Sequence, residues 1–201
     1  MILIILLFLL CCGCQEPPPV SEIDFVAQIE KHRTEKDVSF KGSENSPIPD
    51  ERKTEFQGLS YFPIDLKYRF QVRLQRYNQK ETFEIVTSTG MLRETMRYGY
   101  LKFEIGNSEC VLQVYKLLDI QSEYPNYLFV PFLDATTGKG SYPGGRYLDF
   151  EENDSAIYTL DFNLAYAPSC AYGKAGYNCP IPPAENKLDV AIQAGEKYPT
   201  F

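Results

Sequence analysis

The sequence predicts a mainly β fold, an antiparallel barrel or sandwich with one N-terminal helix, built as a single domain. Several segments after residue 56 alternate apolar and polar side chains with a period of two, which is typical of half-buried strands. No long helical period separates these segments, and this argues against a parallel sheet with crossover helices. The length of 201 residues suits one domain with an N-terminal appendage.

The composition supports a folded domain and excludes one class of partner. Hydrophobic residues make up 44% of the chain and charged residues 23%, which is enough apolar material for a sizeable core. The formal net charge is −7 and the isoelectric point is about 4.9. The chain therefore lacks the basic footprint that nucleic acid requires, and we expect no nucleic-acid partner.

The N-terminus has the pattern of a lipoprotein signal peptide. Residues 2–10 are unbroken hydrocarbon, shorter than the roughly 20 residues of a spanning helix but typical of a signal-peptide core. Gly13 directly before Cys14 resembles the bacterial lipobox, and on that resemblance Cys14 would carry the lipid and become the mature N-terminus. Two features depart from the pattern, because Cys11 stands where leucine is usual and no lysine or arginine precedes the core.

This pattern divides the chain into three parts. Residues 1–14 are the expected lipoprotein signal peptide, residues 15–20 a proline-rich tether, and residues 21–201 the β-rich domain. The expected location is the bacterial cell envelope, on its periplasmic or extracellular side, with the membrane reached through the N-terminal lipid. An ordinary cleaved secretory signal is the alternative, and either reading implies export of the folded domain.

Three cysteines lie beyond the signal region: Cys110, Cys170 and Cys179. An exported domain meets an oxidising compartment, which permits one disulfide among them. The simplest pairing joins Cys170 to Cys179 around a glycine-containing loop, and two free thiols are the alternative. A metal site is disfavoured, because the two cysteines have an unusual ligand spacing and no histidine lies near them.

A helix is predicted over residues 21–38, where Ser21 and Asp24 form the N-cap and N3 pair of a capping box. Most of its other residues are charged, so we expect it to lie on the surface of the domain. Residues 40–53 carry glycine and prolines and are predicted to be a loop. Two apolar stripes run along the helix, the first made by Ile23, Val26 and Ala27 and the second by Phe25 and Ile29.

Eight strands are predicted after this loop. In the clearest of them, over residues 66–75, apolar residues alternate with lysine, arginine and glutamine. A hairpin turn is expected at Gly106-Asn107-Ser108. The eight segments are residues 66–75, 82–87, 100–105, 110–117, 128–132, 146–150, 157–162 and 188–192.

Two long segments of the second half carry a family resemblance. VPFLDATTGKGSYPGGRYLDF and LDFNLAYAPSCAYGKAGYNCPIPPAENKLDVAIQAGE resemble the bacterial family called domain of unknown function 1684. The resemblance extends over nearly all of the chain beyond the signal region and implies one compact domain of this size. It brings no assigned activity and no catalytic residues, so the candidate site below is inferred from residue chemistry alone.

Several chemistries are excluded by the residues present. The only histidine is His32, in the charged helix, so a Ser-His-Asp or Cys-His triad is excluded unless that helix folds back over the site. Zinc sites built from several histidines are excluded for the same reason, and we expect neither a metal nor a cofactor. Gly138-Lys139 does not complete a phosphate-binding loop, because Leu133 occupies the position of its first glycine.

The candidate ligand-binding residues lie mainly in and around two loops that follow predicted strands. Arg146 adjoins a Gly-Gly turn and could fork onto a carboxylate or phosphate, or form a structural ion pair with Asp149 or Asp161. Asp161 and Asn163 leave one face of their strand, where they could hold a sugar or polyol or brace the following turn. The full set is Thr137, Tyr142, Arg146, Asp161, Asn163, Tyr166, Asn186 and Glu196.

These observations predict a surface-tethered domain that binds a small polar or anionic ligand near the two loops. One alternative is an enzyme that uses no histidine, with Asp161 and Glu196 as its acid and base. Another is a structural envelope protein that binds a second protein through a sheet edge or an apolar patch. The sequence identifies no particular protein partner.

Overall fold

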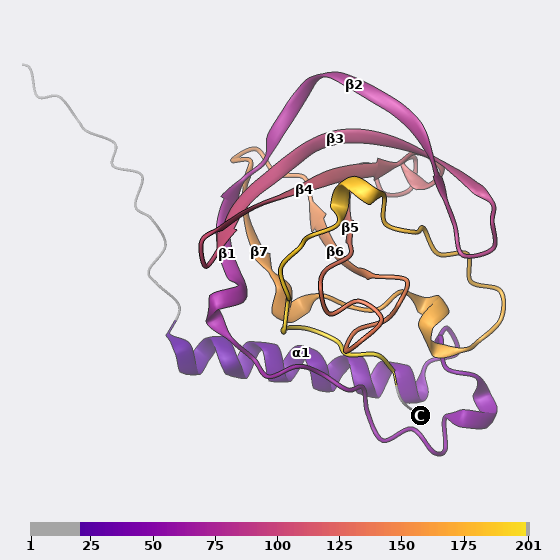
Figure 1. The fold of residues 1–201 in the computed structure, drawn as a ribbon. Coiled ribbons are helices and arrows are strands. Elements are labelled where there is room, and N and C mark those ends of the chain that lie inside the picture. The colour runs from indigo at the N-terminus through magenta and orange to yellow at the C-terminus, as the bar shows by residue number, and fades with distance from the viewer. Residues whose placement is uncertain (1–20, 200–201) are drawn as a thin grey trace, which may run out of the picture.

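The computed structural model describes residues 21–199. The predictions for the signal peptide, for Cys14 and for the tether fall on residues 1–20 and lie outside the described residues. The described part is mostly β, with two antiparallel sheets and one N-terminal helix (Figure 1). The sheets are sandwich-like and do not close into a barrel, which confirms the predicted fold class. None of the helices in residues 21–199 has the length and apolar character needed to cross a membrane.

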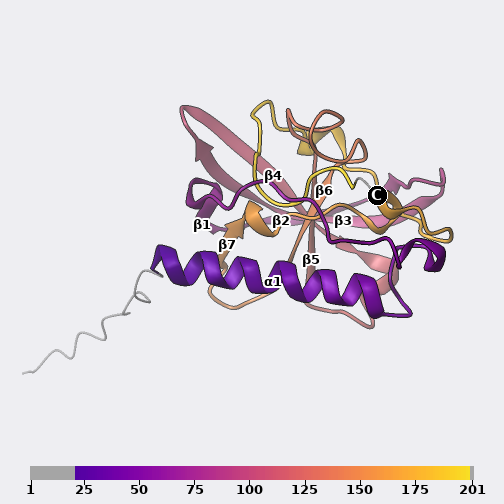
Figure 2. The same cartoon turned by 90° about the horizontal axis from the view of Figure 1, so that it is seen from below.

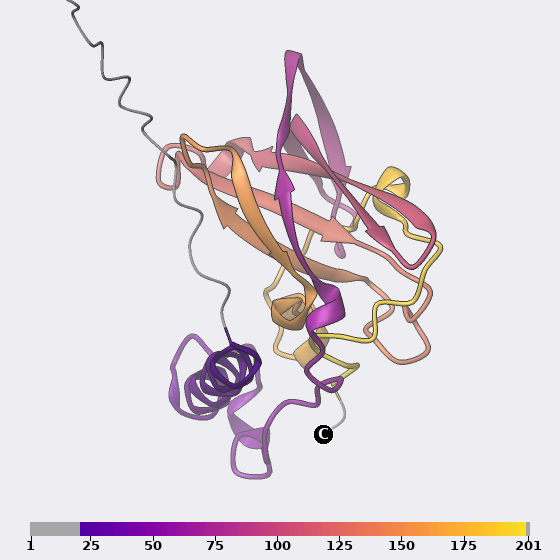
Figure 3. The same cartoon turned by 90° about the vertical axis from the view of Figure 1, so that its left-hand side faces the viewer.

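The helix, α1, spans Glu22–Gly42 and extends beyond its predicted end at residue 38. Its N-cap is Ser21, whose side chain accepts a hydrogen bond from the Asp24 N–H at 3.2 Å, as the capping box predicts. Phe25 and Ile29 are buried, whereas Ile23 is 82% exposed. The second of the two predicted stripes is therefore the face that packs. Figures 2 and 3 show α1 lying across one side of the strands.

The larger sheet has the strand order β2-β3-β4-β5-β6, with all pairs antiparallel. Its β3–β4 hairpin turns at Gly106 and Asn107, as predicted, and Gly106 supplies the positive φ of 61°. β3 begins at Leu92 and not at residue 100, because its outer half pairs with β2. β2 is mostly solvent-exposed, whereas Thr95 and Tyr98 of β3 are buried. The strands are β2 Gln75–Val86, β3 Leu92–Ile105, β4 Ser108–Leu117, β5 Tyr127–Phe132 and β6 Arg146–Glu151.

The smaller sheet pairs β1, Arg69–Arg73, with β7, Ile157–Asp161. Only Leu74 separates β1 from β2, so the predicted strand over residues 66–75 serves both sheets. The inner faces of the two sheets share one core, which includes Val72, Leu112, Val130, Leu148, Leu160 and Phe162. Short 3-10 turns lie at Asp50–Arg52, Leu66–Tyr68, Leu118–Ile120, Phe162–Leu164, Ser169–Tyr172 and Ala184–Asn186.

The prediction of a strand over residues 188–192 is wrong. This segment is irregular, and it runs beside the loop after β5 and not beside a strand. The Leu188 N–H donates to the Leu133 carbonyl at 2.8 Å, and the Ala135 N–H donates to the Val190 carbonyl at 3.0 Å. Apolar residues do alternate in this segment, but its backbone groups form hydrogen bonds with a loop and not with a sheet.

The two loops of the predicted site meet in space. The backbones of Tyr147 and Tyr166 exchange two hydrogen bonds, of 2.9 and 3.1 Å. Tyr142, from the loop after β5, packs against a cluster that contains Ala167 and Tyr172 of the segment after β7. A disulfide joins Cys170 to Cys179 within that second segment, with 6.2 Å between their Cα atoms; Cys110 is buried with a free thiol.

Arg146, at the start of β6, is 1% exposed and lies inside the protein. Its guanidinium donates to Asp134 Oδ2 at 3.3 Å and to the Ile192 carbonyl at 2.8 Å, and also to the Ala194 carbonyl. Asp134 in turn accepts a hydrogen bond from the Ile192 N–H at 2.6 Å. Arg146 thus forms a structural ion pair, but its partner is Asp134 and not the expected Asp149 or Asp161.

We expect Arg146→Ala to lower the free energy of unfolding by about 3–5 kcal/mol, because it leaves the buried Asp134 without its counter-charge. Urea denaturation of the wild-type and variant proteins measures the change. Lys31→Ala is the matched control, since Lys31 and Glu35 form an exposed ion pair at 3.8 Å that contributes less than about 0.5 kcal/mol. Equal effects of the two substitutions would contradict the structural role of Arg146.

Candidate functional site

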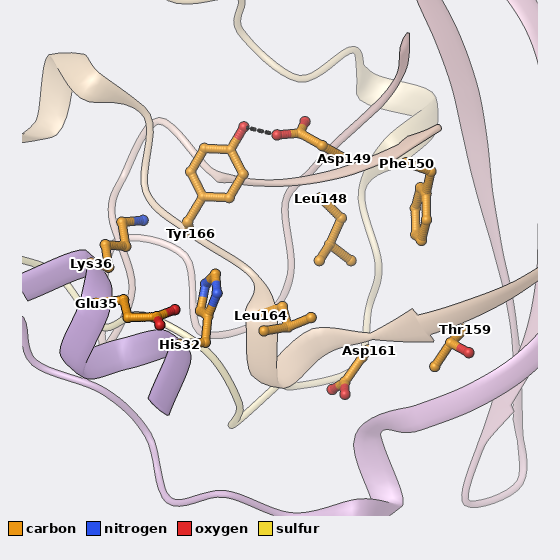
Figure 4. Close-up of a pocket in the computed structure, with 10 residues that line it drawn as sticks. All are labelled: His32, Glu35, Lys36, Leu148, Asp149, Phe150, Thr159, Asp161, Leu164 and Tyr166. Atoms are coloured by element: carbon orange, nitrogen blue, oxygen red, sulfur yellow. Dashed lines mark hydrogen bonds between the residues drawn. The ribbon is translucent and has the colours of Figure 1, made fainter. Parts of the chain in front are cut away.

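A cleft of about 540 Å³ lies between α1, β6 and the segment formed by β7 and the turn after it (Figure 4). It is the candidate site because it joins an apolar wall to several polar groups from separate parts of the chain. Its polar side chains are His32, Glu35, Lys36, Asp149, Thr159 and Asp161, and its largely apolar ones are Leu148, Phe150, Leu164 and Tyr166.

Asp149 stands at the centre of a hydrogen-bonded group on β6. The Tyr127 hydroxyl donates to Oδ1 at 2.7 Å, and the Tyr166 hydroxyl donates to Oδ2 at 2.5 Å; Figure 4 shows the second bond. The surrounding protein raises the pKa of the Asp149 carboxyl above its ordinary value, and the two tyrosine hydroxyls partly oppose this rise. Because water still reaches this exposed residue, screening keeps the energetic consequence small.

The wall formed by α1 carries His32, Glu35 and Lys36, which Figure 4 shows on one side of the cleft. The Lys36 ammonium pairs with Glu196 and lies 4.8 Å from the centroid of the Tyr166 ring. Burial, and then the charge of Lys36, lower the pKa of His32. A neutral imidazole at this position can both donate and accept a hydrogen bond.

The far wall contains Asp161, which is 4% exposed. Asn163 donates to its Oδ1 twice, from the backbone at 2.9 Å and from the side-chain amide at 2.8 Å. Arg69 Nε lies 3.5 Å from its Oδ2. Burial raises the pKa of Asp161, against the hydrogen bonds from Asn163. Asp161 therefore braces the turn after β7 while it also lines the cleft.

Asn186 and Glu196, also predicted from sequence, are internal braces. The Asn186 side chain bonds both backbone groups of Gln113, at 2.7 and 3.0 Å, and the Pro131 carbonyl at 2.7 Å. The Glu196 carboxylate accepts from Lys36 through one oxygen, and through the other from the Tyr172 hydroxyl and the Ala167 N–H. Since Glu196 does not line this cleft, it does not face Asp161 across it as an acid–base pair would.

The structure therefore brings two of the eight predicted residues, Asp161 and Tyr166, to the cleft. Asn163 holds the turn beside it and Arg146 lies in the core. Thr137 accepts a hydrogen bond from the Asp134 N–H at 3.0 Å and donates to its side chain. Tyr142 stacks on Tyr198 with 5.7 Å between ring centroids. Apart from Asp161 and Tyr166, the predicted residues serve to fix the loops.

Sequence reasoning missed the contribution of α1 and of Asp149. A signal for the helix was present, because Phe25, Ile29, His32 and Lys36 follow one another at intervals of four, three and four residues. That spacing places them on one face of a helix, and the two apolar members are the buried ones. The helix does fold back over the site. This is the condition under which the sequence did not exclude a catalytic role for His32.

The charges in the cleft favour some ligands over others. Glu35 and Asp149 supply two carboxylates, and a third, that of Asp161, is already paired with Arg69. Lys36 is the one lysine or arginine in the lining. Glu196 already neutralises that lysine. An anionic ligand is therefore disfavoured, and a neutral or cationic one is favoured. Among residues 21–199, no group of three or more His, Cys, Asp or Glu side chains is placed to hold a metal ion.

We expect Asp149 to titrate at a higher pH than Asp65, whose pKa is lowered by its hydrogen bond from Lys67. Carboxyl carbon shifts in an NMR titration measure both. Tyr166→Phe removes a hydrogen bond to the carboxylate and should raise the Asp149 pKa further. A raised pKa means that the folded state holds the Asp149 proton more tightly than the unfolded chain does. The stabilisation that the protonated Asp149 carboxyl gives the folded state is therefore present at low pH and is lost as the pH rises through the raised pKa. Titration of Asp149 below Asp65 would contradict the assignment.

Comparison with known proteins gives a family and a relative of known structure. The family described as "Protein of unknown function (DUF1684)" matches residues 54–197. The solution NMR structure of an uncharacterised protein from Haloarcula marismortui is similar, with 37% sequence identity and a TM-score of 0.64 over 87% of this chain and 95% of that one. No curated protein matches the chain. The chain belongs to the DUF1684 family.

Proposed function

We propose that this protein is an exported, lipid-anchored binding protein of the bacterial cell envelope, with a small polar ligand held between α1, β6 and β7. The cleft is the observation that carries the ligand-binding part. Its apolar side chains can exclude water from a ligand, while its carboxylates, imidazole and hydroxyls come from three separate segments and converge on it. Small-molecule sites combine these two features.

The ligand is neutral or cationic in this proposal. The sequence alone predicted a polar or anionic ligand, the anion because of Arg146, but that guanidinium is buried and bound to Asp134 and to backbone carbonyls. The groups that line the cleft are mostly acceptors, such as the Asp149 carboxylate. Hydroxyl, amide and ammonium donors of a ligand complement such a surface.

The anchoring part of the proposal rests on sequence. Gly13-Cys14 follows an unbroken apolar core, and a proline-rich segment then leads to Ser21, the N-cap of α1. A lipid on Cys14 would thus be followed by a short spacer and then by the helix that forms one wall of the cleft.

We expect Leu164→Trp to abolish ligand-induced stabilisation. Leu164 lines the cleft and is 36% exposed, so an indole can fill the space without disturbing the core. A saturating ligand at 100 times its dissociation constant stabilises the folded state by about 2.7 kcal/mol. Thermal melting against a panel of polyols, sugars, amines and short peptides measures this.

The control for that experiment is Leu92→Trp. Leu92 is a 56% exposed leucine of β3 that does not line the cleft, so its variant should keep the ligand response of the wild type. A ligand whose stabilisation survives Leu164→Trp binds elsewhere, and that outcome would remove the support for this cleft.

We expect Cys14→Ala to abolish lipid attachment and to release the protein from the membrane fraction. Metabolic labelling with radioactive palmitate followed by fractionation of cells measures both effects. Cys12→Ala is the control, because Cys12 lies in the same stretch but does not follow the small residue of the lipobox-like pattern. Equal labelling of the wild type and the Cys14→Ala protein would show that the anchor is not at this cysteine.

A further inference from the structure

The edge of β6 that faces the cleft has backbone groups without a strand partner. Tyr147 exchanges its two backbone hydrogen bonds with Tyr166. Its partner in β5 is Pro131, which has no N–H to donate. Tyr147 therefore directs its N–H and C=O away from β5. The alternation of an antiparallel ladder gives Asp149, two residues on, the same direction. Within residues 21–199, no hydrogen bond outside the strand ladders uses the Asp149 backbone.

The edge of β7 that faces the cleft has the same property. The Leu74 N–H donates to the Ala156 carbonyl at 2.8 Å, and Tyr158 and Leu160 continue this pattern of hydrogen-bonded pairs with β1. Thr159 lies between them, so its backbone N–H and C=O point away from β1. They too take part in no hydrogen bond outside the strand ladders of the described chain, although the Thr159 hydroxyl accepts a hydrogen bond from Gln71 at 2.7 Å.

These two edges diverge around the cleft. β6 and β7 are consecutive in the chain but are not paired with each other. Near the turn that joins them, the rings of Phe150 and Tyr158 are in contact, with 5.5 Å between centroids. Further from the turn, Asp149 and Thr159 both line the open space. The cleft thus lies where one further strand could pair with both sheets.

We infer that the ligand of this cleft is a short peptide in extended conformation that adds a strand between β6 and β7. This inference rests on the proposed function and names its ligand class. An extended peptide presents alternating N–H and C=O groups along both of its edges, and such groups satisfy unpaired sheet edges by strand addition. The free backbone groups of Asp149 and Thr159 supply the two edges that it requires.

The side chains around the cleft indicate which peptide it takes. Glu35 and Asp149 favour a lysine or arginine of the peptide by charge complementarity. Leu148 and Leu164 offer apolar surface beside them. Because alternate residues of a strand point to opposite faces, a basic residue flanked by small or apolar residues fits this arrangement.

The test uses amide hydrogen exchange, read residue by residue by NMR. The probe is a pool of acetylated, amidated pentapeptides with lysine or arginine at the central position. The matched probe is the same pool with the backbone nitrogens of the second and fourth residues methylated, which keeps the charge but removes the donors of one peptide edge. We expect the first pool to protect the Asp149 and Thr159 amides, and the methylated pool to bind roughly tenfold more weakly.

A pair of variants tests the same contact from the protein side. Thr159→Pro removes the N–H that faces the cleft, and edge positions of this kind tolerate proline. Thr159→Val is its control, because it removes the hydroxyl but keeps the backbone donor. We expect the proline variant to weaken binding of the peptide pool roughly tenfold and the valine variant to retain it. If Thr159→Pro fails to fold, the two peptide pools still decide the question with the wild-type protein.

The outcomes separate this inference from the proposed function. Equal binding of the two pools, or peptide binding without protection of Asp149 and Thr159, would overturn strand addition. A non-peptide ligand whose stabilisation is lost in Leu164→Trp, together with no binding of either pool, would overturn the peptide inference while it supports the cleft. If Leu164→Trp changed the stabilisation by none of the probes, both the peptide inference and the proposed cleft would be overturned.

Discussion

The arrangement of this domain depends on one buried charge, the guanidinium of Arg146. Burying a charge costs several kcal/mol unless it is paired and hydrogen-bonded. Asp134 supplies the counter-charge at 3.3 Å, and the carbonyls of Ile192 and Ala194 accept further hydrogen bonds from the guanidinium. Because these carbonyls belong to a segment with no regular secondary structure, Arg146 gives that segment a defined position that no sheet or helix provides.

The position of α1 follows from this anchored segment. Gly195, directly after Ala194, has a φ of 76°, and a Cβ there would lie 2.5 Å from the Ala165 carbonyl, so the chain passes closely behind the turn after β7. Glu196 is then buried where its carboxylate meets Lys36 of α1. A single line of contacts thus runs from the start of β6, through the C-terminal segment, to the helix that closes the cleft.

Local patterns predicted most of the strands, because a period of two reports directly on which side chains face the core. They failed where the backbone groups form hydrogen bonds with a segment that is distant in the sequence. The alternation at residues 188–192 is that of a strand, yet its hydrogen bonds go to Leu133 and Ala135 of a loop. The outer half of β3 was missed for the opposite reason. Its buried residues Thr95 and Tyr98 do not follow a period of two, because the register with β4 shifts between Arg97 and Gly99.

The candidate site was harder to predict than the fold. Asp161 and Tyr166 were found because they follow a strand, where loop residues commonly form sites. Arg146 was overvalued, because a sequence does not show whether a guanidinium points to solvent or to a buried aspartate. His32 and Lys36 were undervalued, because their spacing shows which face of the helix they share but not that this face packs over a sheet edge more than one hundred residues away.

The two walls of the cleft come from separate stretches of the sequence, with a consequence for how the cleft can diversify. The part of the chain that matches the family begins at residue 54, after α1 has ended at Gly42. One wall therefore belongs to the part of the chain that the family model matches, and the other to a helix that precedes this part. Substitutions confined to the exposed face that carries His32 and Glu35 would alter what the cleft admits without touching the Arg146–Asp134 pair. Selectivity and foldability are thereby placed on separate stretches of sequence, and evolution can change one while it keeps the other.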